Sequence, residues 1–334
     1  SNTTVNAASV DLKGVGFNHS NLTINNGNLN ITNNASSSLA NNNITVTNGS
    51  FSVLAKAGSL SLSGTNITAN NISVQVNRGG VLLNGAVVNS TVGGLDIMAG
   101  LGDINVSTSC ITAVNNVSLL AMAGGVDLTN GTLNSSAGAV NVTAQGGDFL
   151  LGAGNISAQT DITLNASGKA DLNGGTLNST AGNISVSAVS TTSADGISLS
   201  DNGSVSAANG TVTLQGSSAT GAGVKVYNAT LNASSLAVNG SSQSGNGFSL
   251  TNVTLGSSLS DLTNVTLSSA GSGAGATNIL DSSVVTASNR DTLMNMIIGG
   301  MTTVDMCGTA IYENGTQAWV KDYGNASAPN NGWI

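Results

Sequence analysis

TLNSSAGAVNVTAQGGDFLLGAG occupies residues 132–154, NISAQTDITLNASGKADLNGG follows at 155–175, and TLNSTAGNISVSAVSTTSADGISLSDNG at 176–203. Each stretch contains a short run of β-forming residues, a turn of small residues, an alternating apolar run, a glycine-rich turn and a second apolar run. The same order recurs upstream at 65–85 and 109–131. A period of about 20 to 25 residues without helical periodicity is typical of a β-solenoid, in which each repeat forms one coil.

Alternation of apolar and polar residues predicts which side chains of each coil point inward. In the coil 176–203 the inward positions are Leu177, Ile184, Val186, Ile197 and Leu199. The equivalent positions of the two preceding coils are Ile156, Ile162, Leu164 and Leu172, and Leu133, Val140, Val142 and Leu150. Stacking buries these side chains in a shared interior, and backbone hydrogen bonds then run from coil to coil.

The sequence therefore predicts an all-β protein, a right-handed parallel β-helix of about a dozen coils of 21–24 residues. Glycine pairs such as 124–125, 146–147 and 174–175 are expected at sharp corners, where they supply a positive φ. Recurrent Asn134, Asn178 and Asn232 are expected to form side-chain ladders. The repeats cover residues 1–285. Residues 286–334, which hold both tryptophans, are predicted to be atypical terminal coils, a cap or a small extra-helical segment.

The charge of the chain is low and acidic. Only 7% of its residues are charged and the formal net charge is −8, so no basic patch is available to bind nucleic acid. No apolar run of transmembrane length occurs, and membrane insertion is not expected. The first residues, SNTTVNAASV, lack the basic and apolar regions of a signal peptide.

Chemistry-bearing residues are sparse and dispersed. Aspartates occur about once per coil, and Asp127, Asp148 and Asp171 recur near the third strand as a potential axial row. His19 is the only histidine and Glu313 the only glutamate. Clustered carboxylates for acid–base or metal chemistry are therefore not evident. We expect no enzymatic activity, no catalytic or metal site and no cofactor.

Two further residue types receive a plain structural interpretation. Cys110 and Cys307 lie too many coils apart to pair and are expected to be buried thiols that behave as small apolar residues. The threonine pairs 45/47 and 211/213 look isolated, so no coil-by-coil threonine array of the ice-binding kind is expected.

The motif Asn-x-Ser/Thr occurs about 28 times. In a chain so rich in these residues, one interpretation is that turns and strands simply require them. The other is a set of sugar acceptors on outward positions. The candidate glycosylation sites are Asn21, Asn43, Asn66, Asn71, Asn116, Asn141, Asn155, Asn178, Asn183, Asn228, Asn252, Asn264 and Asn314.

With this repeat, this composition and phrases such as GSLSLSGTNITANNISV at 58–74 and GNISVSA at 182–188, the chain resembles a known group of exoproteins. These are the filamentous haemagglutinin-like and high-molecular-weight-adhesin-like proteins of Gram-negative two-partner secretion. The resemblance covers residues 1 to about 285. The NPNL/NPNG-type signatures of the secretion domain are missing, so the chain would be an internal or distal segment.

The resemblance implies a secreted, β-helical surface adhesin connected with virulence, sometimes glycosylated, and exported by an outer-membrane secretion partner. Its partners would be host-cell surface glycans or glycoproteins. Trp319 and Trp333 are candidate contact residues. Two alternatives stay open: a structural stalk without binding of its own, and, less favoured, a polysaccharide-processing enzyme.

Overall fold

The computed structural model of the chain describes residues 2–14, 21–256, 262–271, 278–281, 283–287, 304–305, 310–313 and 316–320. Within these ranges every regular element is a β-strand, and the strands form a parallel β-solenoid of about 11 turns. The predicted fold class is confirmed, while the hand of the coil stays a prediction. The chain divides into two compact units, residues 1–167 and 168–334.

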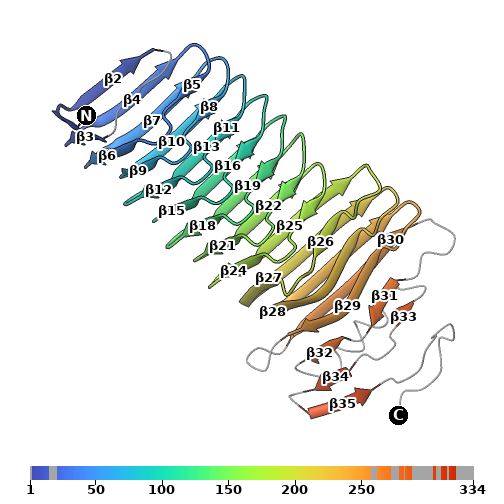
Figure 1. Cartoon of the computed structure of the whole chain (residues 1–334). Coiled ribbons are helices and arrows are strands. Elements are labelled where there is room, and N and C mark those ends of the chain that lie inside the picture. Colours follow the sequence, from blue (N-terminus) through green and yellow to red (C-terminus); the bar gives the residue numbers. More distant parts are fainter. Residues whose placement is uncertain are drawn as a thin grey trace. The chain divides into compact units, whose positions relative to one another are not determined.

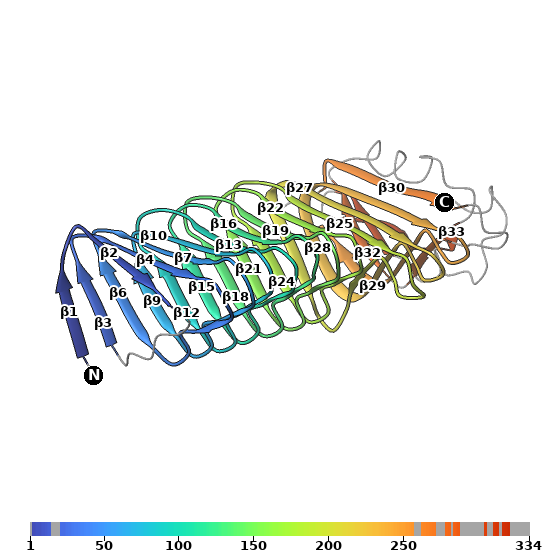
Figure 2. The ribbon, with the colours of Figure 1, turned by 90° about the horizontal axis from the view of Figure 1, so that it is seen from above.

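Unit 1 is built from three sets of strands, and the strands of a set pair in parallel from coil to coil (Figures 1 and 2). The first set is β1 (Asn2–Asn6), β3 (Asn21–Asn25), β6 (Asn43–Thr47), β9 (Asn66–Ala69), β12 (Val87–Ser90), β15 (Cys110–Ala113), β18 (Thr132–Ser135) and β21 (Asn155–Ala158). The second set is β2 (Ser9–Lys13), β4 (Asn28–Asn33), β7 (Ser50–Ala55), β10 (Asn71–Val76), β13 (Leu95–Ala99), β16 (Val117–Ala121), β19 (Val140–Ala144) and β22 (Ile162–Ala166). The third set is β5 (Ser37–Ser38), β8 (Leu60–Ser61), β11 (Val81–Leu82), β14 (Ile104–Asn105), β17 (Val126–Asp127) and β20 (Phe149–Leu150).

The interior of unit 1 consists of columns of aliphatic side chains in register. One column on the first set runs through Ile67, Val88, Ile111, Leu133 and Ile156. Each of these side chains is at most 1% exposed. Every coil thus buries its apolar strip against its neighbours, as the alternation predicts.

The predicted inward positions are buried with one exception, Leu150. In β20 it is Phe149 that points inward, 1% exposed and in register with Val126, while Leu150 is only half-buried and pairs with Asp127. The prediction for Leu150 was wrong because three consecutive apolar residues, 149–151, leave the phase of the alternation open. The large aromatic ring takes the interior position, where it excludes more water.

Unit 2 contains β23 (Ala170–Asp171), β24 (Thr176–Ser179), β25 (Ile184–Ser190), β26 (Ile197–Leu199), β27 (Ser204–Ser218), β28 (Val224–Ser242), β29 (Phe248–Leu255), β30 (Asn264–Gly271), β31 (Asn278–Asp281), β32 (Val284–Ala287), β33 (Val304–Asp305), β34 (Ala310–Glu313) and β35 (Thr316–Val320). The pairings within unit 2 are parallel except that of β34 with β35, which is antiparallel. The proposed boundary at residue 286 stays a prediction.

Coil length differs between the units. In unit 1 the partners Asn2 and Asn21 are 19 residues apart (21 − 2) and Asn43 and Asn66 are 23 apart (66 − 43). In unit 2 the partners Thr176 and Ser204 are 28 apart (204 − 176). The prediction of coils of 21–24 residues was therefore wrong for unit 2 and for the first coil of unit 1. The additional residues lie in wider corners, such as 191–196, and in the long strands β27 and β28.

The corner glycines serve two different physical needs. Gly174 has a φ of 68°, as predicted. At Gly124 and Gly146 the need is space, because a Cβ there would lie 2.5 Å from the carbonyl carbon of Gly102 and 2.2 Å from that of Ala123. For those glycines the predicted positive φ was wrong: the polypeptide of the coil below comes too close for any side chain.

Residues with a left-handed backbone conformation mark the corners that lead into the first strands β6, β9, β12, β15, β18 and β21. Five of them are Asn41, Gly64, Gly85, Asn130 and Gly152, with φ of 57°, 64°, 68°, 57° and 51°. Thr108 holds the same position in its coil with a φ of 55°. Asparagine and glycine tolerate this conformation, whereas a β-branched residue is strained in it.

We predict that Thr108→Asn stabilises unit 1 by about 1 kcal/mol, because asparagine adopts the left-handed conformation at lower cost. Equilibrium urea denaturation of the two proteins measures the difference. Thr112→Asn makes the same chemical change in strand β15 and should bring no gain, since asparagine is a poorer strand former. Equal or lower stability of Thr108→Asn would contradict the strain account.

Candidate binding faces

The outward side of the first strand set of unit 1, here called the first face, carries two columns of mostly polar side chains, which Val87 and Cys110 interrupt. Inward aliphatic residues alternate with these outward positions along each strand. One column is Asn2, Asn21, Asn43, Asn66, Val87, Cys110, Thr132 and Asn155. The other is Thr4, Thr23, Thr45, Thr68, Asn89, Thr112, Asn134 and Ser157. The strands of the first face run side by side in Figure 2. The face is thus an uncharged array of amides and hydroxyls, with Val87 and Cys110 between them.

Hydrogen bonds between coils hold part of this array in place. The side-chain amide of Asn21 donates to the Oδ1 atom of Asn2 at 2.5 Å. Farther along, the hydroxyl of Thr112 donates to Oδ1 of Asn89 at 2.8 Å. Such ladders fix side-chain rotamers, so a ligand that meets them finds them already ordered.

The threonines of the first face overturn one expectation. Thr45 is not isolated, because it pairs with Thr23 in one neighbouring coil and with Thr68 in the other. The threonine column was missed because the coil lengths vary, so the spacing in the sequence is irregular. By contrast, Thr211 pairs with Ser235 and Thr213 with Ser185 and Ala237, so that pair is isolated as expected.

The expected asparagine ladders form at other positions. Asn134 pairs with Thr112 and Ser157, and the amide of Asn232 donates to the hydroxyl of Ser206 at 3.2 Å. Asn178 also pairs with Ser206. The ladder of unit 2 instead runs through three asparagines with a left-handed backbone conformation: the amide of Asn252 donates to Asn228 and that of Asn228 to Asn202, each at 3.0 Å.

The structure separates the candidate glycosylation sites into several places. Four lie in one column of the first face: Asn21, Asn43, Asn66 and Asn155. Two lie on the second strand set, four on strands of unit 2 and two at corners: Asn71 and Asn141; Asn178, Asn228, Asn252 and Asn264; Asn116 and Asn183. Asn314 is outside the described residues.

Several of these asparagines have a structural role, because they accept hydrogen bonds from the backbone or adopt a left-handed backbone conformation. Oδ1 of Asn116 accepts a hydrogen bond from the backbone N–H of Ala139 at 2.9 Å, and Oδ1 of Asn183 accepts one from that of Thr211 at 2.8 Å. Asn228 and Asn252 adopt the left-handed conformation. This use of asparagine supports the interpretation that the fold requires it, and glycosylation stays a prediction.

The tryptophan candidates lie mostly outside the described residues. The backbone of Trp319 belongs to β35, where it is paired with Ile311 of β34. The side chain of Trp319 and the whole of Trp333 lie outside the description, so their role as contacts stays a prediction.

Cys110 is exposed at an outward position of β15, next to Val87 of β12. The expectation of a buried thiol was wrong for this residue. The inward position of the strand belongs to Ile111, and the alternation then places its neighbour Cys110 outward. Cys307 lies outside the described residues.

Asp127 and Asp148 do not form the potential axial row. Asp127 pairs with Asn105 and Leu150, and Asp148 lies at the corner before β20. Asp148 and Asp103 hold the equivalent corner position two coils apart, on either side of Gly125. Together with Asp127 they line an open groove of about 430 Å³ over several glycines.

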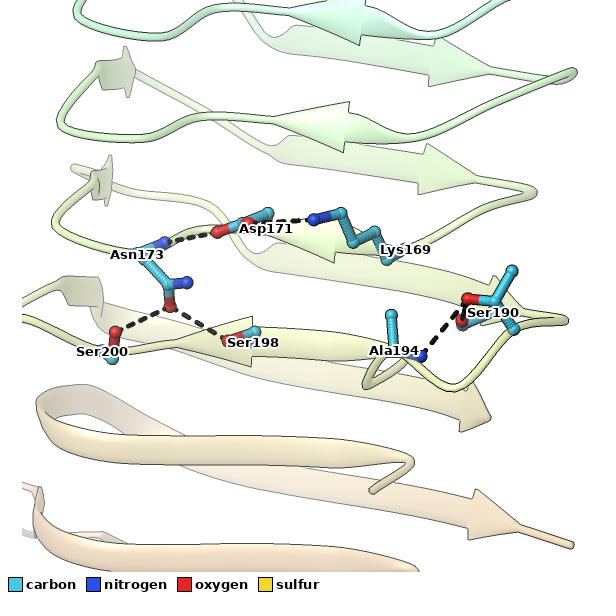
Figure 3. A network of polar contacts seen from close by, with 8 residues as sticks. Lys169, Asp171, Asn173, Ser190, Ala194, Ser198 and Ser200 are labelled. Carbon is cyan, nitrogen blue, oxygen red and sulfur yellow. Dashed lines mark hydrogen bonds and ion pairs between the residues drawn. The ribbon is translucent and has the colours of Figure 1, made fainter. Parts of the chain in front are cut away.

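Polar side chains of unit 2 also satisfy one another (Figure 3). The Nζ atom of Lys169 lies 3.2 Å from Oδ2 of Asp171. The Oδ1 atom of Asn173 accepts hydrogen bonds from the hydroxyls of Ser198 at 3.0 Å and Ser200 at 2.9 Å. The Lys169 and Asp171 side chains are 32% and 27% exposed, so solvent screens their attraction and the pair adds little stability. The cluster joins neighbouring coils.

Within the described ranges no three His, Cys, Asp or Glu side chains gather closely enough to hold a metal ion. None of the described elements is a helix of sufficient length and apolar character to cross a membrane. A scan of protein-family models, a search of curated proteins and a search of solved structures each gave no significant match to the chain. The prediction of no enzymatic activity stays a prediction.

Proposed function

We propose that this chain is a segment of a secreted bacterial surface adhesin that attaches to glycans or glycoproteins through the first face. The observation that carries the proposal is the pair of in-register columns on eight successive strands, β1 to β21, which are polar except at Val87 and Cys110. The parallel β-solenoid and the resemblance of the repeats to secreted adhesins support the extracellular role.

The chemistry of the first face suits sugars. Amides and hydroxyls are the groups that hydrogen-bond sugar hydroxyls, and the columns repeat them at the coil spacing of about 4.8 Å. Thr23, Thr45 and Thr68 place three such hydroxyls in adjacent coils. Because no charged side chain occurs in either column, recognition would depend on hydrogen bonding and shape and respond little to salt.

We predict that the purified chain binds glycans on an array and attaches to host cells. Replacing Thr23, Thr45 and Thr68 together by alanine should lower the apparent affinity at least about tenfold, because three hydrogen-bonding groups are lost. The matched control replaces Ser52, Ser73 and Ser118, outward on the second strand set, by alanine. Equal losses for both triple variants, or none for either, would contradict binding at the first face.

The second candidate is a structural stalk of a larger exoprotein. The hydrogen bonds between asparagines of successive coils favour it, because they show polar outward groups engaged in holding coils together. The glycan array and the cell-attachment assay also distinguish these two functions. A stalk predicts that the unaltered chain binds no glycan and no cell, whereas the adhesin predicts saturable binding that is lost with the three threonines.

A further inference from the structure

The charges of unit 1 are distributed unevenly along its coils. Residues 1–80 contain Lys13, Lys56 and Arg78 against one carboxylate, Asp11, which gives +2 (3 − 1). Residues 81–167 contain five aspartates and no lysine or arginine, which gives −5. The five are Asp96, Asp103, Asp127, Asp148 and Asp161. One end of unit 1 is therefore cationic and the other anionic.

This polarity is sharpest at the corner that follows the second strand set. The corner, here called the second corner, comprises residues 56–59, 77–80, 100–103, 122–125 and 145–148 of five successive coils. From coil to coil it presents the exposed cations Lys56 and Arg78, then Leu101 together with Asp103, then Met122, and then Asp148. Leu101 is 65% exposed and Met122 49% exposed, so two large apolar side chains face water between the charges.

Half-buried apolar residues extend the exposed pair onto the adjoining strands. Leu54, Met98 and Leu120 occupy the outward column of β7, β13 and β16, which ends at the second corner, with Gln75 between the first two. Met98 and Leu120 are direct partners in neighbouring coils. Exposed apolar groups that gather in this way, and are flanked by charge, mark an interaction surface.

The acidic groove lies at the anionic side of the same corner. It is lined by Asp103, Asp127 and Asp148 and floored by glycines, and its volume is about 430 Å³. Both Asp103 and Asp148 are exposed at its rim. Four glycines, 124, 125, 146 and 147, form part of the lining together with Asn105, Ala123, Val126 and Leu150. The space over these glycines lets a guanidinium or ammonium group approach the carboxylates.

We propose that the second corner is an antiparallel interface with a second copy of this chain. A two-fold rotation about an axis between the coils of Leu101 and Met122 brings the coil of Arg78 in one copy onto the coil of Asp148 in the other. Arg78 of each copy then enters the acidic groove of its partner, while the apolar side chains of both copies pack around the two-fold axis. The surface is self-complementary, as an isologous contact requires.

The size of the surface sets the strength of the association. The four coils from Arg78 to Asp148, at about 4.8 Å spacing, span roughly 15 Å, so the buried area lies near or below the roughly 1,200 Å² of weak, transient interfaces. Opposite charges on both sides of the axis make the interaction sensitive to salt. The dimer is therefore a reversible one that forms at high local concentration.

Sedimentation equilibrium of the full chain at up to roughly 300 µM and low salt tests the proposal. The average mass should rise from 32.6 kDa toward twice that value, and it should fall again at high salt. Arg78→Glu and Asp148→Lys should each weaken dimer formation at least about tenfold, since each places like charges opposite each other. Lys225→Glu makes a charge change of the same size as Arg78→Glu, but in unit 2, and should leave the dimer unchanged.

Mixing the Arg78→Glu chain with the Asp148→Lys chain gives the decisive result. In the mixed dimer the glutamate introduced into one chain faces the lysine introduced into the other, and on the opposite side of the axis the native Arg78 faces the native Asp148. The mixture should therefore recover the affinity of the unaltered chain. A chain that remains monomeric at low salt, variants that dimerise normally, or a mixture no stronger than its components would each overturn the proposal.

Discussion

Gly240→Ala should destabilise unit 2 by at least about 3 kcal/mol, a large effect for one methyl group. A Cβ at Gly240 would lie 1.8 Å from the carbonyl oxygen of Gly247, far inside van der Waals contact. Gly216, its partner in the preceding coil, meets the oxygen of Gly223 in the same way at 2.0 Å. In each of these two coils the backbone at the first glycine lies against the backbone at the second, Gly240 against Gly247 and Gly216 against Gly223. A side chain at the first glycine must therefore push the two backbone segments apart.

The matched control is Gly85→Ala in unit 1. A Cβ at Gly85 meets no atom within 4 Å, and the cost of the substitution comes only from its φ of 68°. We expect about 1 kcal/mol for that conformational penalty. Equilibrium denaturation measures the free energy of unfolding of both variants and so compares steric crowding with backbone strain. Equal losses of stability would contradict the close approach of the backbone at Gly240 to that at Gly247.

Phe149→Ala should have the second large effect, a loss of about 3–5 kcal/mol, because it removes a fully buried ring and leaves a cavity. Phe149 is 1% exposed and stacks on Val126 of the preceding coil. In a solenoid each coil contacts only its neighbours, so the damage should remain local.

Hydrogen exchange measured by mass spectrometry shows where stability is lost. We expect faster exchange in β17, β19, β20 and β22, which adjoin the cavity, and unchanged exchange in β3 and β6. Phe51→Ala, the equivalent deletion in β7, should move the effect to the coils around Leu29 and Ile72. Uniform acceleration over all coils after either substitution would contradict nearest-neighbour stabilisation.

The architecture was predictable from the sequence because the repeat of apolar runs and turns determines the stacking of coils, although not the exact length of each coil. Alternation identified Leu133, Val142 and Leu177 as interior residues, and all three are buried. It failed at Leu150, where consecutive apolar residues offered two phases. Exact coil lengths also escaped prediction, because corners such as 191–196 accept insertions without disturbing the stacked strands.

The first face and the second corner were harder to predict than the fold, since both depend on the register between coils. Variable spacing hid the alignment of Thr23, Thr45 and Thr68. A signal existed: Asn-x-Thr opens four successive first strands, β1, β3, β6 and β9, and alternation places both residues of the motif outward. The second corner was missed because Leu101 and Arg78 look unrelated until the coils are stacked.

Disulfide formation between neighbouring coils tests the stacked register most directly. Val87 and Cys110 are partners in β12 and β15, at the distance that a disulfide can bridge, while Asn89 lies two residues farther along its strand. In a background with Cys307→Ser, mild oxidation of Val87→Cys should give an intramolecular bond to Cys110, identified by peptide mass. Asn89→Cys should give none. An efficient disulfide from position 89, or no disulfide from position 87, would contradict the register on which the first face and the second corner depend.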